Sequence, residues 1–503
     1  MSRTVGALDA AGPAASGIGS YRVAALALVV ALVAALAASL GIGVRAIEQA
    51  EAAVDEPQYL LSAVSLAEDG DLNIADELAD GRASDYHRSP LPVQTAVRAD
   101  GSQVSPHDPL LPLMLAPAVG LGGWMGGKLL LAGTAAMLAA LTFWVAVRRF
   151  AVPVPLAAVV VAVASASVPM AVYGHQVYPE VPAALAVMVA VAALTGPLRR
   201  GGLAAWVLAV VALPWLSVKY APVAAVVAVA GLLLLWRSGR AALSFAVVGV
   251  LAVAGAVFLA VHRVVYGGWT AYASGDHFQT TGEFAVSGVS PDYAGRSVRL
   301  AGLLVDQDFG LVAWQPAWLL AVAAVAALVR LRPRGWGLLV APLLAGWLVA
   351  TFVALTMHGF WFPGRQVVVV APLAVVAVCV WLAAVPWRTG WWSIAAALGA
   401  VGVAVYGWLI VAGRAGTLDW VGAPDVTPPA PLAALRSVLP DYRVLDGTDW
   451  LLHGVWLLAL LALAVAGRRS VRTVVGAQAA ARAAAAAGQP DSPRLVSTTK
   501  GEM

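Results

Sequence analysis

The stretch VAALALVVALVAALAASLGIGV, residues 23–44, decides the fold class because it holds 22 residues without one charged side chain. A helix of about 20 apolar residues crosses the ~30 Å hydrocarbon core of a bilayer. Similar runs recur along the 503 residues, of which 61% are hydrophobic and 12% charged, with a mean hydropathy of +0.83. Such a composition excludes an ordinary soluble domain. The sequence therefore predicts an all-α polytopic membrane protein, with this first run as a retained anchor rather than a cleaved signal.

About twelve transmembrane helices are predicted from the apolar runs and from the glycines, prolines and charges that separate them. They cover residues 23–44, 127–147, 153–172, 181–197, 202–214, 221–236, 241–261, 311–329, 336–356, 367–386, 391–412 and 451–467. The fifth run is short and is interrupted at Pro214, which predicts a broken or re-entrant segment. The single cysteine, Cys379, lies inside a predicted span, so an intrachain disulfide is impossible.

Arginine residues mark one side of the membrane. If the N-terminus is cytoplasmic, every second loop is short and basic, as the positive-inside rule requires. These loops hold Arg148 and Arg149, Arg199 and Arg200, Arg237 and Arg240, Arg330, Arg332 and Arg334, Arg388, and Arg468, Arg469 and Arg472. We therefore predict residues 1–22 as a cytoplasmic N-terminus, 23–467 as the integral membrane domain and 468–503 as a cytoplasmic, disordered tail without a soluble C-terminal domain. Because the basic residues are scattered rather than gathered in a patch, no nucleic-acid partner is expected.

The other side of the membrane holds the long polar loops. They cover residues 45–126, 173–180, 213–222, 262–310, 356–366 and 413–450. The first contains VDEPQYL, residues 54–60, whose adjacent acids Asp55 and Glu56 allow two interpretations. Pro57 favours the first turn of a helix, which a preceding carboxylate can cap. Alternatively, a partly desolvated acid at the membrane face has a raised pKa and can take a proton from a hydroxyl group.

Six segments, taken in chain order, carry a family resemblance. They are VDEPQYL (54–60), SPHDPLLPLMLAPA (105–118), YGHQVYPEVPAAL (173–185), LPWLSVKYAP (213–222), DQDFGLVAWQPAWLL (306–320) and GFWFPGRQ (359–366). With an Asp-Glu pair directly after the first span, the chain resembles the GT-C superfamily of membrane glycosyltransferases, of the protein mannosyltransferase and aminoarabinose transferase type. The similarity is to a mostly uncharacterised, actinobacterial-type branch.

The resemblance implies an activity and a location. A sugar would move from a polyprenyl-phosphate donor to an acceptor hydroxyl of a glycan, lipid or protein, on the outer face of the bacterial cytoplasmic (plasma) membrane. Attack opposite the phosphate inverts the anomeric carbon in one displacement, so one general base suffices and no covalent intermediate forms. Membrane lipids would be the other partners of the chain.

The resemblance also implies roles for three acids. Asp55 falls where the family places its general base, and Glu56 would tune the pKa of Asp55 or hold a sugar hydroxyl. Glu180 matches a second acidic position of the superfamily. Its alternative is an ordinary helix start, because Pro179 and Pro182 flank it.

Three basic residues on the outer side break the positive-inside trend and are the candidate ligands of the donor phosphate. Lys219, Arg365 and Arg263 lie at predicted span ends, where a fixed Lys or Arg can neutralise a phosphate at the bilayer surface. The alternative is a charge that snorkels to lipid headgroups. For Arg263, beside His262, we favour that alternative.

Sugar or acceptor contacts are predicted for Tyr59, His107 and Trp361, although a tryptophan at this depth also fits an interfacial aromatic belt. No cofactor or metal ion is assigned. His107 and Asp108, with Asp85 and His87, could ligate a divalent ion together with Asp55, as some members of the superfamily do. Their spacing fits no zinc signature, and the prolines around both pairs favour turn-capping aspartates and surface histidines.

Two other classes of protein stay open. A secondary transporter predicts ionisable residues buried in mid-span and paired Gly or Pro breaks in two repeated halves. The sequence keeps nearly all its charges at span ends or in loops and has no visible repeat. The third class is a non-catalytic membrane protein of an envelope-assembly machine, for which the six ordered segments would be coincidental.

Overall fold

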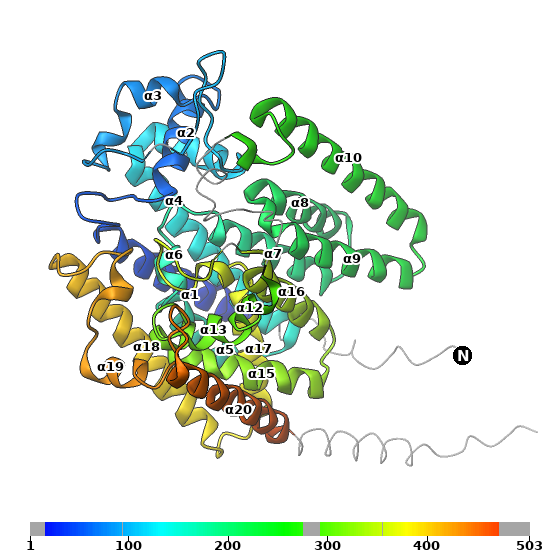
Figure 1. Cartoon of the computed structure of the whole chain (residues 1–503). Coiled ribbons are helices and arrows are strands. Elements are labelled where there is room, and N and C mark those ends of the chain that lie inside the picture. Colours follow the sequence, from blue (N-terminus) through cyan, green and yellow to red (C-terminus); the bar gives the residue numbers. More distant parts are fainter. Residues whose placement is uncertain (1–15, 93, 275–291, 355, 472–503) are drawn as a thin grey trace, which may run out of the picture.

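The computed structural model describes residues 16–92, 94–274, 292–354 and 356–471. Over these ranges the regular secondary structure is helical, with three isolated β-bridges and no longer strand (Figure 1). The all-α prediction is therefore confirmed. Most of the predicted N-terminal segment (1–15) and of the predicted tail (472–503) lies outside the described residues, as does 275–291 within the predicted loop 262–310.

Twelve apolar helices of the described chain fall one by one on the twelve predicted spans. Seven are long and apolar enough to cross a membrane: α1 (Ser16–Ile42), α4 (Leu110–Phe150), α9 (Ala221–Arg237, preceded by the 3₁₀ turn η2, Val218–Tyr220), α10 (Ala241–Tyr266), α16 (Trp336–Leu348, continued by η5, Val349–Val353), α18 (Trp391–Arg414) and α20 (Gly447–Ser470). Five are shorter: α5 (Val154–Ser165), α7 (Glu180–Leu194), α8 (Arg200–Leu216), α15 (Leu319–Leu331, preceded by η4, Pro316–Trp318) and α17 (Ala371–Ala384). The chain is a multi-pass membrane protein, and the crossing of the five shorter helices stays a prediction.

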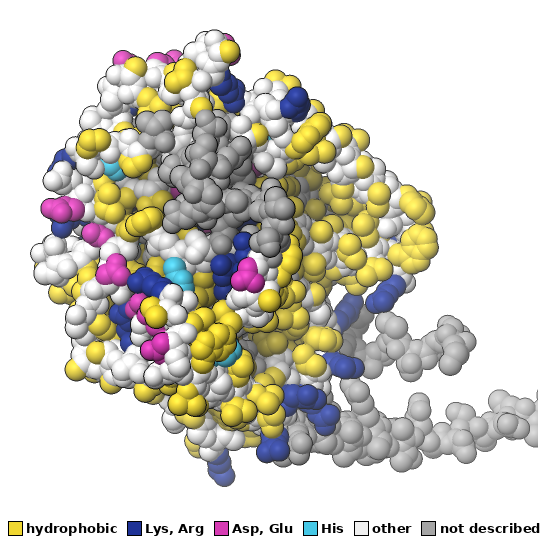
Figure 2. All heavy atoms as spheres, in the orientation of Figure 1, with side chains coloured by type: hydrophobic (Ala, Val, Ile, Leu, Met, Phe, Trp, Pro, Cys, Tyr) yellow, Lys and Arg dark blue, Asp and Glu magenta, His cyan; other side chains and the backbone are white. Residues whose placement is uncertain are grey.

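Exposed apolar surface shows which helices face lipid. Only 17% of the apolar window of α10 and 6% of that of α20 are buried. Figure 2 shows hydrophobic side chains covering the side of the molecule on which α10 lies. With no protein packed on these faces in the described chain, their apolar side chains suit the hydrocarbon interior of a bilayer.

Two predicted features of the spans can be compared with the helices. Helix α4 begins at Leu110 and bends close to the predicted end of the first outer loop at residue 126, so that boundary stays a prediction. Gly122 and Gly123 kink this helix, and Gly123 has a φ of 59° that a glycine adopts without steric cost. Helix α8 runs through Pro214 to Leu216 without the predicted break. A proline two residues from a helix end leaves only a short stretch of helix after it to be disturbed.

Helix α4 is the helix on which the predicted first outer loop packs. The helix α2 (Glu56–Glu68), which begins with the acid pair, packs on α4, and α4 also packs against α1 and α7. Figure 1 shows α2 and the short α3 (Ala75–Ala79) together at one end of the molecule. Helix α7 begins with Glu180, so the two helices that carry the predicted acids at their starts, α2 and α7, both pack on α4.

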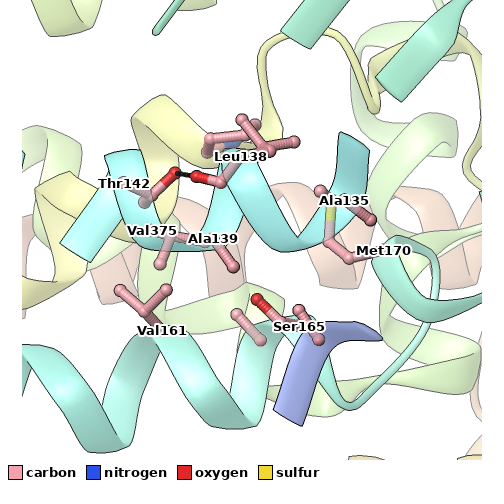
Figure 3. A pocket seen from close by; sticks show the side chains of 11 residues that line it. Ala135, Leu138, Ala139, Thr142, Val161, Ser165, Met170 and Val375 are labelled. Atoms are coloured by element: carbon pink, nitrogen blue, oxygen red, sulfur yellow. Dashed lines mark hydrogen bonds between the residues drawn. The ribbon is translucent and has the colours of Figure 1, made fainter. Parts of the chain in front are cut away.

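A pocket between the helices is too small for a substrate. It encloses about 20 Å³ between α4 and α5, which is room for about one water molecule (Figure 3). Leu138, Val161 and Met170 are among its lining side chains, and the hydroxyl of Thr142 donates to the carbonyl of Leu138 at 2.7 Å. No charged residue lines it, so this pocket is not a candidate site.

Candidate active site

Four charged side chains from four distant segments meet beside the start of α2. Arg365 donates from Nη2 to Asp55 Oδ2 at 2.8 Å and from Nε to Glu180 Oε1 at 3.0 Å. Lys219 Nζ donates to the same Glu180 oxygen at 2.8 Å. Asp55, Glu180 and Arg365 are buried, whereas 23% of the Lys219 side chain is exposed. We call these four residues the charge cluster.

Helix ends and a tight turn bring the cluster together. Asp55 occupies the N-cap position of α2 and Glu180 is the first residue of α7. Arg365 follows Gly364, which has a φ of 88° and packs against Pro169. A Cβ atom on Gly364 would lie 3.0 Å from the ring of Pro169, so the turn has no room for a side chain there. The turn at Gly364 therefore fixes the direction in which Arg365 leaves the backbone.

The capping interpretation accounts for the position of Asp55 and not for the partner of its carboxylate. Its side chain makes no capping hydrogen bond in α2, although Pro57 lies in the first turn as predicted. The carboxylate instead binds Arg365. The predicted raised pKa of Asp55 is wrong as well. Burial alone would raise this pKa, but the charge of Arg365, with smaller contributions from His107 and Lys219, outweighs burial and lowers it.

The buried side chain of Glu56 contacts three segments of the chain. Its Oε1 accepts from the backbone N–H of Val177 at 2.7 Å, and its Oε2 accepts from that of Ala53 at 3.2 Å. Lys128 Nζ, on α4, lies 3.7 Å from Oε1 and donates to the carbonyl of Glu51 at 2.5 Å. The Glu56 side chain therefore ties the segment before α2 to the segment before α7 and to α4.

Sequence reasoning missed Lys128, although a signal was present. It is the one charge between residues 110 and 147 of an apolar run, and in the structure it is fully buried. An ionisable residue inside an apolar helix needs a partner or a function. Here Glu56 and the carbonyl of Glu51 supply the partners.

His107 and Tyr59 form a stacked pair. Their ring centroids lie 4.5 Å apart with an interplanar angle of 22°, and His107 Nε2 lies 3.2 Å from Gln94 Oε1. The prediction of a surface histidine is wrong, because both rings are buried. Burial lowers the pKa of His107 to about 4 against the opposing charge of Asp55, so the ring is neutral at pH 7.

Asp108 fastens the segment that carries Lys219. Its Oδ1 lies 3.0 Å from His262 Nε2 on α10, and its Oδ2 accepts from the backbone N–H of Val218 at 3.0 Å. Both oxygens of Asp108 contact residues far along the chain rather than its own turn, so its prediction as a turn cap is wrong. Sequence reasoning treated His262 only as a neighbour of Arg263 and missed this contact, which joins residues 154 positions apart.

The second predicted pair lies away from these contacts. Asp85 is exposed at the end of the 3₁₀ turn η1 (Arg82–Asp85). His87 is buried, not on the surface as predicted, and its Nδ1 lies 2.8 Å from the carbonyl of Ser89. Neither residue has a hydrogen bond to Asp55 or His107 among the contacts of the described chain.

Trp361 joins the cluster and Arg263 does not. The guanidinium carbon of Arg365 lies 4.0 Å from the ring centroid of Tyr178 and 5.3 Å from that of Trp361. Arg263 is exposed at the end of α10, where it donates to the carbonyl of Gly267 and lies 5.9 Å from the ring centroid of Trp269. Its contacts fit the snorkelling alternative and include no member of the charge cluster.

A cavity of about 790 Å³ is lined in part by the segment that precedes Arg365 in the sequence. His358 and Phe360 line it from this segment, and Asp419, Asp425 and Arg443 line it from the connection between α18 and α20. His358 Nε2 is held 3.1 Å from the buried Asp306 Oδ2. Figure 2 shows charged and histidine side chains gathered in the region of α12 (Tyr293–Arg296), α13 (Arg299–Val305) and α19 (Ala430–Arg436) of Figure 1. Volumes of this order are typical of ligand sites.

Comparisons with known proteins give one likeness. No protein-family model matches the chain, and no curated protein matches its sequence. The solved structures include a similar one, ArnT from Cupriavidus metallidurans bound to undecaprenyl phosphate. The two chains share 16% sequence identity with a TM-score of 0.46, over 91% of this chain and 73% of that one.

Proposed function

We propose that this protein is a glycosyltransferase that moves a sugar from a polyprenyl-phosphate donor to an acceptor hydroxyl by one inverting displacement. The reaction takes place on the outer face of the bacterial cytoplasmic membrane, with both chain termini in the cytoplasm. The observation that carries the proposal is the charge cluster. It holds a buried carboxylate, which can accept a proton, in contact with a cation that can bind a phosphate.

Lys219 and Arg365 bind the donor phosphate. In the absence of donor their two positive charges are balanced by Asp55 and Glu180, and Lys219 is the most exposed of the four side chains. We expect the phosphate to contact Lys219 first and then Arg365, whose planar guanidinium suits an oxyanion. The leaving polyprenyl phosphate keeps its negative charge against these two cations, which lowers the barrier to its departure.

Asp55 takes the acceptor proton, and donor binding prepares it for this step. While Arg365 holds Asp55 Oδ2, the lowered pKa makes the carboxylate a weak base. A phosphate that competes for Arg365 removes the largest opposing charge, and burial then raises the pKa of Asp55. The acceptor oxygen loses its proton to Asp55 and bonds to the anomeric carbon. The bond from that carbon to the phosphate oxygen breaks, and the phosphate takes the electron pair.

Glu180 and Glu56 position the reacting groups. One oxygen of Glu180 accepts from both Lys219 and Arg365, so Glu180 sets the spacing of the two cations. Its other oxygen, Oε2, is buried and has no hydrogen-bond partner in the described chain, which leaves it available to a sugar hydroxyl. Glu56 holds the backbone on which Asp55 sits, because its own oxygens bind Ala53 and Val177.

The acceptor reaches Asp55 from the 790 Å³ cavity. The segment that lines this cavity at His358 and Phe360 continues to Trp361 and Arg365 within a few residues. Phe360 is 69% exposed, so its ring is available to stack on a sugar, and the acids and arginines around it can bind hydroxyl groups. Tyr59, His107 and Trp361 would form the wall on the Asp55 side.

The test is a transfer assay with the purified full chain. The protein is incubated with a panel of polyprenyl-phosphate sugars and membrane extract, and both released polyprenyl phosphate and transferred sugar are measured. We expect release with one donor and a loss of about 10²-fold or more in Asp55→Asn, the range typical of a general base. Arg263→Gln is the matched control and should retain activity. If the donor stays intact while its passage across the membrane depends on the protein, the transporter is correct instead.

A further inference from the structure

The turn after α2 has an unbalanced negative charge. Residues 68–80, EDGDLNIADELAD, contain six acids and no Lys or Arg. One of the six, Glu68, pairs with Arg82. Asp71 is also engaged, because its Oδ1 accepts from the hydroxyl of Ser65 at 2.9 Å and from the backbone N–H of Asn73 at 2.8 Å. These contacts leave the remaining acids of the turn without a basic partner in the described chain.

Three of those acids converge. Carboxylate oxygens of Asp69, Asp76 and Glu77, one from each residue, lie within 4.8 Å of one another. Asp69 is the C-cap residue of α2, and Asp76 and Glu77 lie in the first turn of α3. Three oxygens at most 4.8 Å apart lie within about 2.8 Å of a common centre, so small side-chain shifts bring all three to the ~2.4 Å bond length of Ca²⁺.

The burial of Glu77 is a second, independent observation that points to a bound cation. The residue is 4% exposed, and both of its carboxylate oxygens are buried without a hydrogen-bond partner among the described residues. An isolated buried carboxylate is costly unless it is neutralised or coordinates a metal ion. Its neighbours within reach, Asp69 and Asp76, are also acids, so in their ionised form they offer it no hydrogen-bond donor. One of its oxygens nevertheless belongs to the convergent set, so the unsatisfied group is directed at the other two acids.

We propose that Asp69, Asp76 and Glu77 bind a divalent cation, with Ca²⁺ as the best fit, and that this ion fastens α3 to the end of α2. All the ligands are carboxylate oxygens, which hard cations prefer over Zn²⁺ or Cu²⁺. Two of the acids are exposed, which leaves coordination positions for water. Ca²⁺ accepts such irregular geometry, whereas Mg²⁺ needs a near-ideal octahedron.

The ion has a structural role, independent of the proposed transferase activity. Helix α2 has 13 residues, so its end at Asp69 lies about 20 Å from its start at Glu56. The ion is therefore remote from Asp55 and stabilises the outer loop rather than the transition state.

The experiment uses the full chain, purified in detergent and stripped with a chelator. Binding is measured by Tb³⁺ luminescence and its displacement by Ca²⁺ or Mg²⁺, and stability is measured by thermal unfolding. We expect Ca²⁺ in the millimolar range to raise the apparent Tm by about 2 °C or more. Glu77→Gln should lower the affinity for Ca²⁺ about tenfold or more, and it should raise the Tm of the chelated protein because an uncharged amide replaces the buried carboxylate.

Asp80→Asn removes an exposed acid of the same turn that is not one of the three, and it is the control that should keep the wild-type Ca²⁺ response. If Glu77→Gln does not fold, Asp69→Asn tests the same site through an exposed ligand. Equal Ca²⁺ responses in wild type and in a folded ligand variant would overturn the proposal. A wild-type protein that binds neither Tb³⁺ nor Ca²⁺ would also overturn it and would leave the transferase proposal unaffected.

Discussion

Arg365 Nη2 lies 2.8 Å from Asp55 Oδ2 and joins two residues that are 310 positions apart in the sequence. Through its Nε the same guanidinium binds Glu180. One arginine therefore neutralises the candidate base and is also the candidate ligand of the leaving group. A donor cannot engage Arg365 without changing the electrostatic environment of Asp55, and the first two predictions test this coupling.

Arg365→Lys should abolish most activity even though the positive charge is kept. A lysine ammonium cannot reproduce the fork that contacts Asp55 and Glu180 at once. We expect kcat/KM for the donor to fall by more than about tenfold. Arg365→Gln, which leaves two buried acids with one cation, should in addition destabilise the protein by about 3–5 kcal/mol. Activity and thermal unfolding of both variants are to be compared with Arg263→Gln, and an Arg365→Lys variant with normal donor kinetics would contradict the role.

The pH dependence should differ between the free and the donor-bound enzyme. In the free protein the pKa of Asp55 lies below its ordinary value of 3.8. A carboxyl group whose pKa is lower in the folded than in the unfolded state stabilises the fold at pH values above its unfolded-state pKa. This stabilisation is lost as the pH falls through the folded-state pKa. The acid limb of kcat/KM for the donor, which reports free enzyme, should therefore lie below about pH 4. The acid limb of kcat, which reports the donor complex, should lie at higher pH, because in that complex the donor phosphate has displaced Arg365 from Asp55. Coincident limbs would argue against donor-coupled activation.

Glu56 and Lys128 should be coupled energetically. Glu56→Gln leaves the buried Lys128 without its carboxylate at 3.7 Å, and we expect a loss of about 1–3 kcal/mol in the free energy of unfolding. Lys128→Met removes the same pair from the other side. The double variant should be less destabilised than the sum of the two single variants, which a double-mutant cycle measures. Strict additivity would show that the pair does not act as a unit.

Phe360→Ala should separate acceptor binding from donor chemistry. The ring is 69% exposed, so its loss should change stability by no more than about 0.5 kcal/mol. Because it lines the 790 Å³ cavity, we expect the KM for the acceptor to rise about tenfold while the KM for the donor is unchanged. Phe245→Ala, a similarly exposed phenylalanine on α10, is the matched control. An increase in the donor KM alone would indicate that the cavity binds the donor rather than the acceptor.

The positions of helices could be predicted from sequence because an apolar run of bilayer length must pair its backbone N–H and C=O groups within itself, which a helix does. Lys219 and Arg365 could be singled out because the predicted topology puts them on the side where few basic residues are expected, and such a charge needs a partner. Their partners could not be predicted, since Asp55 and Glu180 meet Arg365 only through tertiary packing. The direction of the Asp55 pKa shift failed for the same reason, because it depends on tertiary contacts, chiefly the one to Arg365. The contacts of Lys128 and Asp108 also join segments that are distant in sequence.

The guanidinium carbon of Arg365 lies 4.0 Å from the ring centroid of Tyr178 and 5.3 Å from that of Trp361, so two aromatic rings restrict this side chain. A side chain confined in this way cannot swing out to collect a ligand from the lipid. On the proposed function, the donor headgroup therefore moves to a fixed cation and replaces a carboxylate there, so that little reorganisation energy is needed when charge develops on the phosphate. Smaller rings at these two positions would leave the arginine present but too mobile to serve as an electrostatic anchor.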